Sequence, residues 1–236
     1  MQKGIIAAVG LIAALGLVSC ATRQTVKLGA EDLMGRGQRY YEAKKYDKAS
    51  ADFREVIFNY SGTRVAAEAS YLAAECSYQL KDYETAAEEY QQLLADYPGS
   101  EHADEAQIRV AESYLGQSPN YALDQSETGD RALAAIGKFF EQYPESKLTE
   151  RAKGVQVAIE EKLARKDFEA ARFYVKRGQY LSAKIYLEGI VREYPGTKWA
   201  PQARELLAML PAIKAKSAFN DTTAAAPRDS AGGGKR

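Results

Sequence analysis

One pattern of small and apolar residues occurs four times in this chain, and it constrains the fold more than any other feature. The copies begin at Tyr46, Tyr83, Gly129 and Tyr180, and each ends fourteen residues later at a tyrosine. Alanine stands at offset three, a large apolar residue at offset seven, and apolar residues at offsets ten and eleven. These offsets trace one face of an α-helix. Because such a helix cannot bury its apolar stripe alone, four copies predict a stacked all-α solenoid.

A second helix is expected before three of these copies, because small residues recur nine positions before the first tyrosine. They are Gly37, Ala74 and Ala171. Small side chains here and at offset three allow two paired helices to approach closely. The combination resembles the tetratricopeptide repeat. That resemblance implies a superhelical solenoid of antiparallel helix pairs, with four to five repeats.

The end of each repeated helix carries a stop signal. Proline follows the final tyrosine in three copies, and a hydroxyl residue two positions further on is expected to N-cap the next helix. The residues concerned are Pro98 with Ser100, Pro144 with Ser146, and Pro195 with Thr197. The first copy has Gly62 and Thr63 but no proline.

Unequal spacing between the copies predicts insertions. The final tyrosines advance by 37, 46 and 51 residues. Residues 117–128 are interpreted as an ordered loop, and residues 147–178 as one long helix or two collinear helices. Whether the first half of that segment is a separate repeat is left open. Residues 199–214 are expected to form a capping helix with Trp199 covering the end of the solenoid.

The N-terminus has the features of a lipoprotein signal peptide. After Lys3 comes an apolar run of fifteen residues, shorter than the roughly 20 needed to span a bilayer. It ends in Leu17-Val18-Ser19-Cys20, which resembles the bacterial lipobox. Cys20 would carry the acyl chains, palmitate among them, as the first mature residue. The alternative is an ordinary signal peptide with a chance cysteine.

These features divide the chain into four predicted parts. Residues 1–19 form the signal peptide, 20–30 the lipidated cysteine and a flexible tether, 31–215 the solenoid with its capping helix, and 216–236 a disordered tail. Ala21 follows the cysteine instead of the aspartate that resembles an inner-membrane retention signal. The outer membrane is therefore the expected location.

Composition and motifs argue against nucleic-acid binding and catalysis. Lys plus Arg and Asp plus Glu both number 32, so the basic excess typical of nucleic-acid binders is missing. His102 is the only histidine, which rules out a HExxH pair, and no phosphate-binding glycine loop occurs. Cys76 is interpreted as a small buried hydrophobe. We expect no enzyme activity, no metal and no cofactor.

A peptide groove is the expected functional site, because the first helices of tetratricopeptide pairs line a concave surface. The predicted groove residues are Glu31, Tyr41, Glu68, Tyr71, Glu75, Tyr78, Glu105 and Glu112. Met34 and Ile108 fall in the same exposed register. The N-terminal half of the groove is thus predicted to be acidic and tyrosine-lined, and the C-terminal end basic. The alternative is that the tyrosines pack between helices and the charges are merely solvated.

Lipobox, tether, solenoid and length together resemble the BamD family, the lipoprotein subunit of the machinery that inserts β-barrels into the outer membrane. The most specific stretches are Leu123-Asp124-Gln125, Ala171–Tyr180 and Leu187-Glu188-Gly189. The resemblance implies a periplasmic scaffold that binds unfolded outer-membrane proteins, a BamA-type barrel and accessory lipoproteins. Candidate partner-docking residues are Arg165, Phe168, Arg172, Tyr174, Lys176 and Tyr186.

The chain departs from the family at Tyr186, where family members often carry arginine. A contact made by that arginine would have to be rebuilt, with Arg172 or Lys176 as candidates. Another periplasmic tetratricopeptide lipoprotein, acting in envelope division or cell-wall coordination, remains an alternative. Such proteins often add a coiled coil, and no heptad run precedes Glu31.

Overall fold

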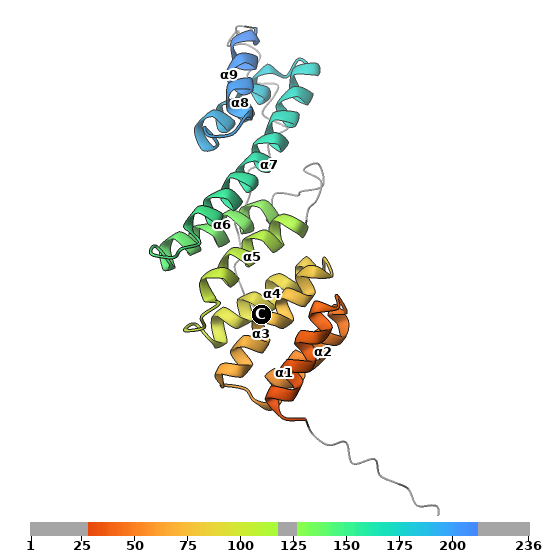
Figure 1. The fold of residues 1–236 in the computed structure, drawn as a ribbon. Helices are drawn as coiled ribbons and strands as arrows, with labels where there is room; N and C mark the ends of the chain where they lie inside the picture. Colours follow the sequence, from red (N-terminus) through yellow and green to blue (C-terminus); the bar gives the residue numbers. More distant parts are fainter. Residues whose placement is uncertain (1–27, 118–126, 212–236) are drawn as a thin grey trace, which may run out of the picture.

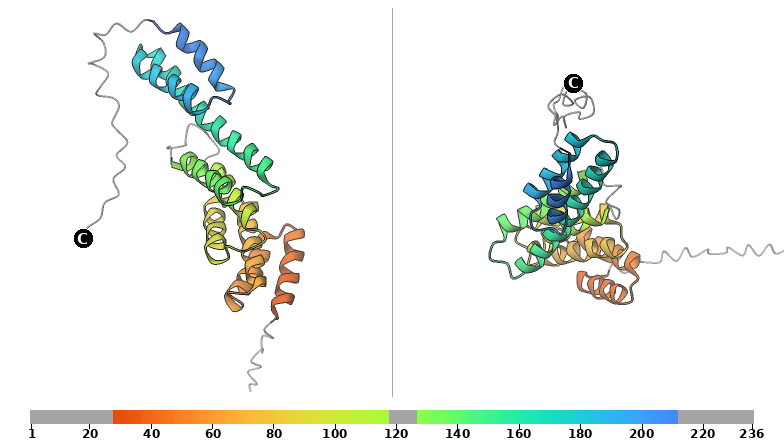
Figure 2. Two further views of the ribbon diagram at one scale, coloured as in Figure 1. Left: turned by 90° about the vertical axis from the view of Figure 1, so that its left-hand side faces the viewer. Right: turned by 90° about the horizontal axis from the view of Figure 1, so that it is seen from above.

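The computed structural model describes residues 28–117 and 127–211, and within these ranges it contains nine α-helices and no strand. The helices are α1 (Ala30–Glu42), α2 (Tyr46–Asn59), α3 (Arg64–Gln79), α4 (Tyr83–Asp96), α5 (Ala103–Gln117), α6 (Glu127–Gln142), α7 (Thr149–Lys176), α8 (Tyr180–Glu193) and α9 (Trp199–Met209). Each helix packs against the next along an elongated molecule, with α1 and α2 at one end and α8 and α9 at the other (Figures 1 and 2). The predicted solenoid of helix pairs is confirmed.

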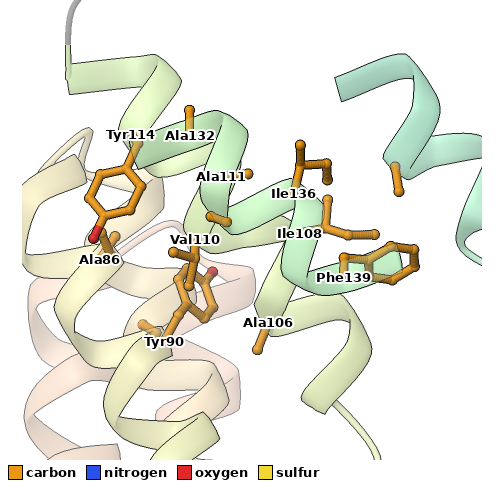
Figure 3. Close-up of a cluster of buried hydrophobic side chains, with 14 of the residues drawn as sticks. Ala86, Tyr90, Ala106, Ile108, Val110, Ala111, Tyr114, Ala132, Ile136 and Phe139 are labelled. Carbon is orange, nitrogen blue, oxygen red and sulfur yellow. The ribbon is translucent and has the colours of Figure 1, made fainter. Parts of the chain in front are cut away.

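The repeated motif forms the buried stripe of α2, α4, α6 and α8. The alanines at offset three are fully buried in all four copies, and so are the large residues at offset seven, apart from a trace of exposure at Ile136. Burying such a side chain contributes about 1.5–3 kcal/mol, so every pair depends on its neighbours for this gain. Figure 3 shows Tyr90, Ile136 and Phe139 of the motif beside side chains of α5.

Small residues in the first helices permit the close approach that the sequence predicts. A Cβ atom added to Gly37 would lie 2.6 Å from Cε1 of Phe53, well inside van der Waals contact. Ala74 and Ala171, in the equivalent positions of α3 and α7, have no exposed surface. Side-chain size at this position therefore sets the distance between the paired helices.

The turn between the helices of a pair is the same in three repeats. Lys44, Lys81 and Gly178 adopt positive φ angles of 56°, 64° and 73°. The following backbone N–H bonds to a carbonyl five residues earlier, as from Lys45 to the oxygen of Tyr40 at 2.8 Å. This is the Schellman arrangement, which favours glycine at the left-handed position. Two of the three turns use lysine there.

The three predicted N-caps, Ser100, Ser146 and Thr197, are wrong, because none of them caps the helix that follows. Thr63, in the copy without proline, accepts a hydrogen bond from the N–H of Ala66 at 3.2 Å and does cap α3. Ser100 and Ser146 accept from the N–H two residues on, in the turn that precedes each helix. Thr197 instead donates to the carbonyl of Tyr194 at 2.8 Å. The extra turn after each proline moves the helix start beyond the hydroxyl residue.

Residues 149–176 form one continuous helix of 28 residues, about 42 Å long. This settles the choice between one and two helices in favour of one. The central core, which runs from Tyr71 to Leu163, includes the first half of α7. The C-terminal core begins at Ala164 and includes the second half together with α8 and α9. A third, N-terminal core joins α1, α2 and α3.

The last helix is shorter than predicted. It ends at Met209 and not at residue 214, because Leu210 adopts the extended angles φ −65° and ψ 136° that a residue before proline prefers. Trp199 packs on Phe168 with ring centres 5.3 Å apart, at the end of the solenoid. The predicted signal peptide, Cys20, the disordered tail and most of the 117–128 loop lie outside the described residues.

Candidate functional site

The inner face of the solenoid is formed by the first helices of the pairs. Residues of α1 contact α3, those of α5 contact α7, and those of α7 contact α9. The predicted groove residues all lie on α1, α3 and α5. The sequence register therefore assigns them to the expected helices, and their individual surroundings decide which can meet a ligand.

Two tyrosine pairs recur on neighbouring repeats. Tyr41 meets Tyr46, and Tyr78 meets Tyr83, each with ring centres 5.3 Å apart in an edge-to-face arrangement. Tyr41 and Tyr78 are half-buried, so part of each ring remains open to solvent. Burial and the charge of Glu75 raise the pKa of Tyr41 to about 12. These rings can supply rigid apolar contact area to a bound polypeptide.

Tyr71, by contrast, is packed within the solenoid. Its ring stacks on His102 at 4.3 Å and lies 6.0 Å from Tyr90. Burial raises its pKa, and the charge of Glu75 adds to the effect. For this tyrosine the structure favours the packing alternative. Met34 and Ile108 are buried as well, which contradicts their place in the exposed register.

Three predicted groove glutamates belong to an ion-pair network, defined here as Glu75, Glu105, Arg109, Glu112 and Arg151. Arg109 Nε lies 2.7 Å from Glu75 Oε1, Nη2 donates to Glu75 Oε2 at 3.2 Å, and Nη1 donates to Glu112 at 3.0 Å. Arg151 donates to Glu105 at 2.8 Å and to both Glu112 oxygens at 3.1–3.2 Å. The network joins α3, α5 and α7.

The charges in the network stabilise one another. Burial alone would lower the pKa of Arg109, but the charges of Glu75 and Glu112 outweigh it and raise the pKa. Burial would raise the pKa of Glu105, yet the hydrogen bond and charge of Arg151 hold it below the usual value. The hydroxyl of Tyr90 donates to Glu75, and the guanidinium of Arg109 lies 4.7 Å from the centre of the Tyr78 ring.

The prediction of a freely acidic groove therefore needs correction. Two arginines compensate three of its glutamates and leave one net negative charge, and Glu75 is buried. The sequence carried one local sign of this pairing. Glu105, Arg109 and Glu112 are spaced by four and three residues, which places all three on one face of a helix. No comparable spacing in the sequence indicated that Arg151, on a distant helix, pairs with Glu105 and Glu112.

The two remaining glutamates are not part of the network. Glu31 is exposed in the first turn of α1, and Glu68 is half-buried on α3. Glu68 lines a cavity of about 350 Å³ between the starts of α3 and α5, together with Arg64, Glu101 and His102. Acidic character at the N-terminal end of the inner face thus rests on these two glutamates, of which only Glu31 is exposed.

The partner-docking candidates divide between two surfaces. Phe168, Arg172 and Lys176 line the C-terminal groove, a cleft of about 540 Å³ between α7 and α9. Val175, Trp199, Leu206 and Met209 complete its apolar lining. Arg165 is exposed on α7, one turn earlier. The expected basic character is moderated here by Glu169, which accepts from Arg172 at 3.1 Å, and by Glu205.

Tyr174 and Tyr186 form the second surface, called here the outer aromatic surface, with Phe173, Arg177 and Ile185. The two tyrosine rings stack with centres 5.6 Å apart, and the Phe173 ring is 5.5 Å from that of Tyr174. Arg177 lies over the Phe173 ring at 4.9 Å. Arg177 therefore brings a cation to the same surface as Tyr186, on the far side of the Phe173 ring, whereas Arg172 and Lys176 face the C-terminal groove. The sequence argument had not singled out Arg177.

Side chains that could support chemistry are few within the described ranges. There, no group of three or more His, Cys, Asp or Glu residues is arranged to hold a metal ion. Cys76 is a buried free thiol, and burial raises its pKa to about 12, which suppresses the reactive thiolate. Among the described helices, none combines the length and the apolar character needed to cross a membrane.

Comparison with known protein families identifies the family of this chain. Residues 28–226 match the family model YfiO, whose description is outer membrane lipoprotein. The chain belongs to this family of outer membrane lipoproteins. Membership supports an association with the cell envelope. It also extends the related region fifteen residues beyond Pro211, the last described residue.

One solved structure offers a distant comparison. A suggested protein-binding protein from Bacteroides ovatus ATCC 8483 matches 83% of this chain and 96% of its own chain. Sequence identity is 13% and the TM-score is 0.37. A similarity this distant says nothing about partners.

Proposed function

We propose that this protein is a lipid-anchored periplasmic scaffold of the β-barrel assembly machinery, of the BamD type. In this role it binds unfolded outer-membrane proteins at the N-terminal inner face and a BamA-type barrel at its C-terminal end. It acts by binding alone, without catalysis or a cofactor. Membership of the outer membrane lipoprotein family and the helical solenoid support the proposal.

The outer aromatic surface carries the proposal. Phe173 is 50% exposed beside the Tyr174 ring, and Ile185, which precedes Tyr186 in the sequence, is 61% exposed. Clustered exposed aromatic and aliphatic side chains with a nearby arginine are the usual composition of an interaction hot spot. A scaffold requires a docking surface distinct from its substrate surface, and this one lies on α7 and α8, away from the Tyr41 and Tyr78 pairs.

Affinity capture from detergent-solubilised outer membranes tests the proposal. The bait is the full chain, compared with a Phe173→Asp, Ile185→Asp variant. Val157→Asp is the matched control, because Val157 is a 52% exposed apolar residue of α7 outside the outer aromatic surface. Far-UV circular dichroism checks that all three proteins keep their helix content.

The wild-type chain and the Val157 variant should recover a large β-barrel protein, and the double variant should lose it. A hot-spot contact of this kind contributes about 2 kcal/mol or more per residue, so the loss should exceed tenfold. Recovery of division or cell-wall proteins instead would favour the other kind of periplasmic lipoprotein. Equal recovery by all three baits would reject the assigned surface.

The lipid anchor is a separate part of the proposal. If Cys20 carries acyl chains, a Cys20→Ala chain should leave the outer-membrane fraction and become soluble in the periplasm. Each buried methylene contributes about 0.8 kcal/mol to membrane binding, so loss of several chains leaves little affinity. A Cys20→Ala chain that still sediments with outer membranes would show that another segment holds it there.

A further inference from the structure

The C-terminal groove is an apolar cleft at the very end of the solenoid. Phe168 and Val175 of α7 form one wall, and Trp199, Leu206 and Met209 of α9 form the other. Inside the solenoid, each such face is covered by the helix that follows. Here α9 is the last described helix, and Met209 stays 66% exposed. The groove thus has a substantial apolar surface and lacks a cover among the described residues.

The chain leaves α9 at the rim of this groove. Met209 lines it, and Leu210 is extended immediately before Pro211, so the backbone turns out of the helix there. Twenty-five residues follow, 212–236. The family match continues to residue 226, so the first part of this segment belongs to the family region and is not an appendage specific to this chain.

The sequence after Pro211 alternates in a way that suits an apolar cleft. Ile213, Ala215, Ser217 and Phe219 occupy every second position, and Lys214 and Lys216 lie between them. In an extended chain, alternate side chains point to the same side. One side of this segment is therefore apolar or small, and the other begins with two cations.

Length agrees with the same placement. From residue 213 to residue 219 an extended chain covers about 20 Å, and the eleven residues of α9 cover about 16 Å. A strand running back along α9 would thus bring Phe219 to Trp199 and Phe168. Its lysines lie on the side away from the groove and would pass Glu205, an exposed carboxylate on the α9 rim, while Arg172 and Lys176 line the α7 wall.

We propose that residues 213–219 of this chain lie extended in the C-terminal groove, antiparallel to α9, with Phe219 against Trp199. The segment then covers the open end of the C-terminal core. The proposal is independent of the assembly role, because it concerns only the chain's own segment and groove.

Trp199 makes the test direct, because it is the only tryptophan of the chain and lines the groove. Acrylamide quenching of its fluorescence is measured on the full chain in detergent. The comparison proteins are a Phe219→Asp variant, a chain ending at Pro211, and a chain ending at residue 222. The last is the matched control, since it lacks the distal tail but keeps residues 213–219.

The full chain and the chain ending at residue 222 should be quenched equally. Phe219→Asp and the chain ending at Pro211 should show a quenching constant about twofold larger, because the indole loses an aromatic cover. A synthetic peptide of residues 212–221 should restore protection to the shorter chain at about millimolar concentration, the effective concentration that a short tether provides.

Equal quenching of all four proteins would overturn the proposal and leave the groove to another occupant. Protection that disappears on dilution of the full chain would assign the groove to a second copy, which also overturns it. Protection gained only when outer-membrane extract is added would assign it to a partner. Far-UV circular dichroism and the emission maximum at each step distinguish an uncovered groove from an unfolded α9.

Discussion

Replacing Arg109 by methionine should destabilise the solenoid far more than removing an exposed arginine. Arg109 binds two carboxylates, of Glu75 and Glu112, and its own side chain is only 19% exposed. Methionine keeps the length and apolar contacts of the side chain but removes the charge. Glu75, at 7% exposure, then keeps only the hydrogen bond from Tyr90.

The magnitude follows from the burial of Glu75. Breaking a buried ion pair by removing one partner costs about 3–5 kcal/mol, because the other charge is left uncompensated. Since Arg109 retains some solvent contact, the lower end, about 3 kcal/mol, is the expected loss. Arg64→Met is the matched control. Its side chain is 88% exposed, and its pair with Glu101 should contribute about 0–1 kcal/mol.

Urea unfolding followed by far-UV circular dichroism measures both variants, the single variant Glu75→Gln and the double variant Glu75→Gln, Arg109→Met. Neutralising Glu75 as well should recover a large part of the loss, because no charge is then buried alone. If Arg109→Met is no more destabilised than Arg64→Met, the network does not stabilise the fold. If the double variant loses as much as the sum of the singles, the two residues are not coupled as the structure indicates.

Three further predictions follow from local geometry. Lys81 and Gly178 both have positive φ, so Lys81→Gly should stabilise the protein by about 1 kcal/mol in urea unfolding and Gly178→Ala should destabilise it by a similar amount. A destabilised Lys81→Gly protein or a stabilised Gly178→Ala protein would contradict the turn assignment. Gly37→Ala should lower stability by about 1–3 kcal/mol because its Cβ would meet a phenylalanine ring of α2, whereas Gly189→Ala, with open space around it, should be neutral or stabilising. Because the pKa of Tyr41 is raised to about 12, its contribution to stability should be complete below about pH 10, where the unfolded residue ionises, and decline toward pH 12; a melting temperature independent of pH in that window would refute it.

The fold was predictable because its determinants are local and repeated. Alanine at offset three and the apolar residues at offsets seven and ten are buried in every copy, and their period is that of a helix. Gly37 and its equivalents also indicated which faces approach closely. Each repeat presents the same packing problem to its neighbour, so one solution propagates along the chain.

The inner face was less predictable, because register gives the face of a helix but not the partner of a charge. Glu75 meets Arg109 across 34 residues, and Glu105 meets Arg151 across 46. The second separation does not follow from the motif spacing, since the insertion before α6 decides where Arg151 lies. The prediction of hydroxyl caps was wrong for a related reason. The serine hydroxyls accept hydrogen bonds inside the turn after each proline, before the helix begins.

The continuous helix α7 fixes the two candidate surfaces relative to each other. Its residues change from the central core to the C-terminal core between Leu163 and Ala164. Just before this boundary two side chains anchor the helix to its neighbours: Lys162 donates to the carbonyl of Leu115 at 3.2 Å, and Glu161 accepts from the N–H of Lys198 at 2.7 Å. Because α7 belongs to both cores, the outer aromatic surface on α7 and α8 is joined to the central core without an intervening loop. The proposed scaffold role would use this continuity, because a docking surface joined to the central core by one shared helix keeps its place relative to that core.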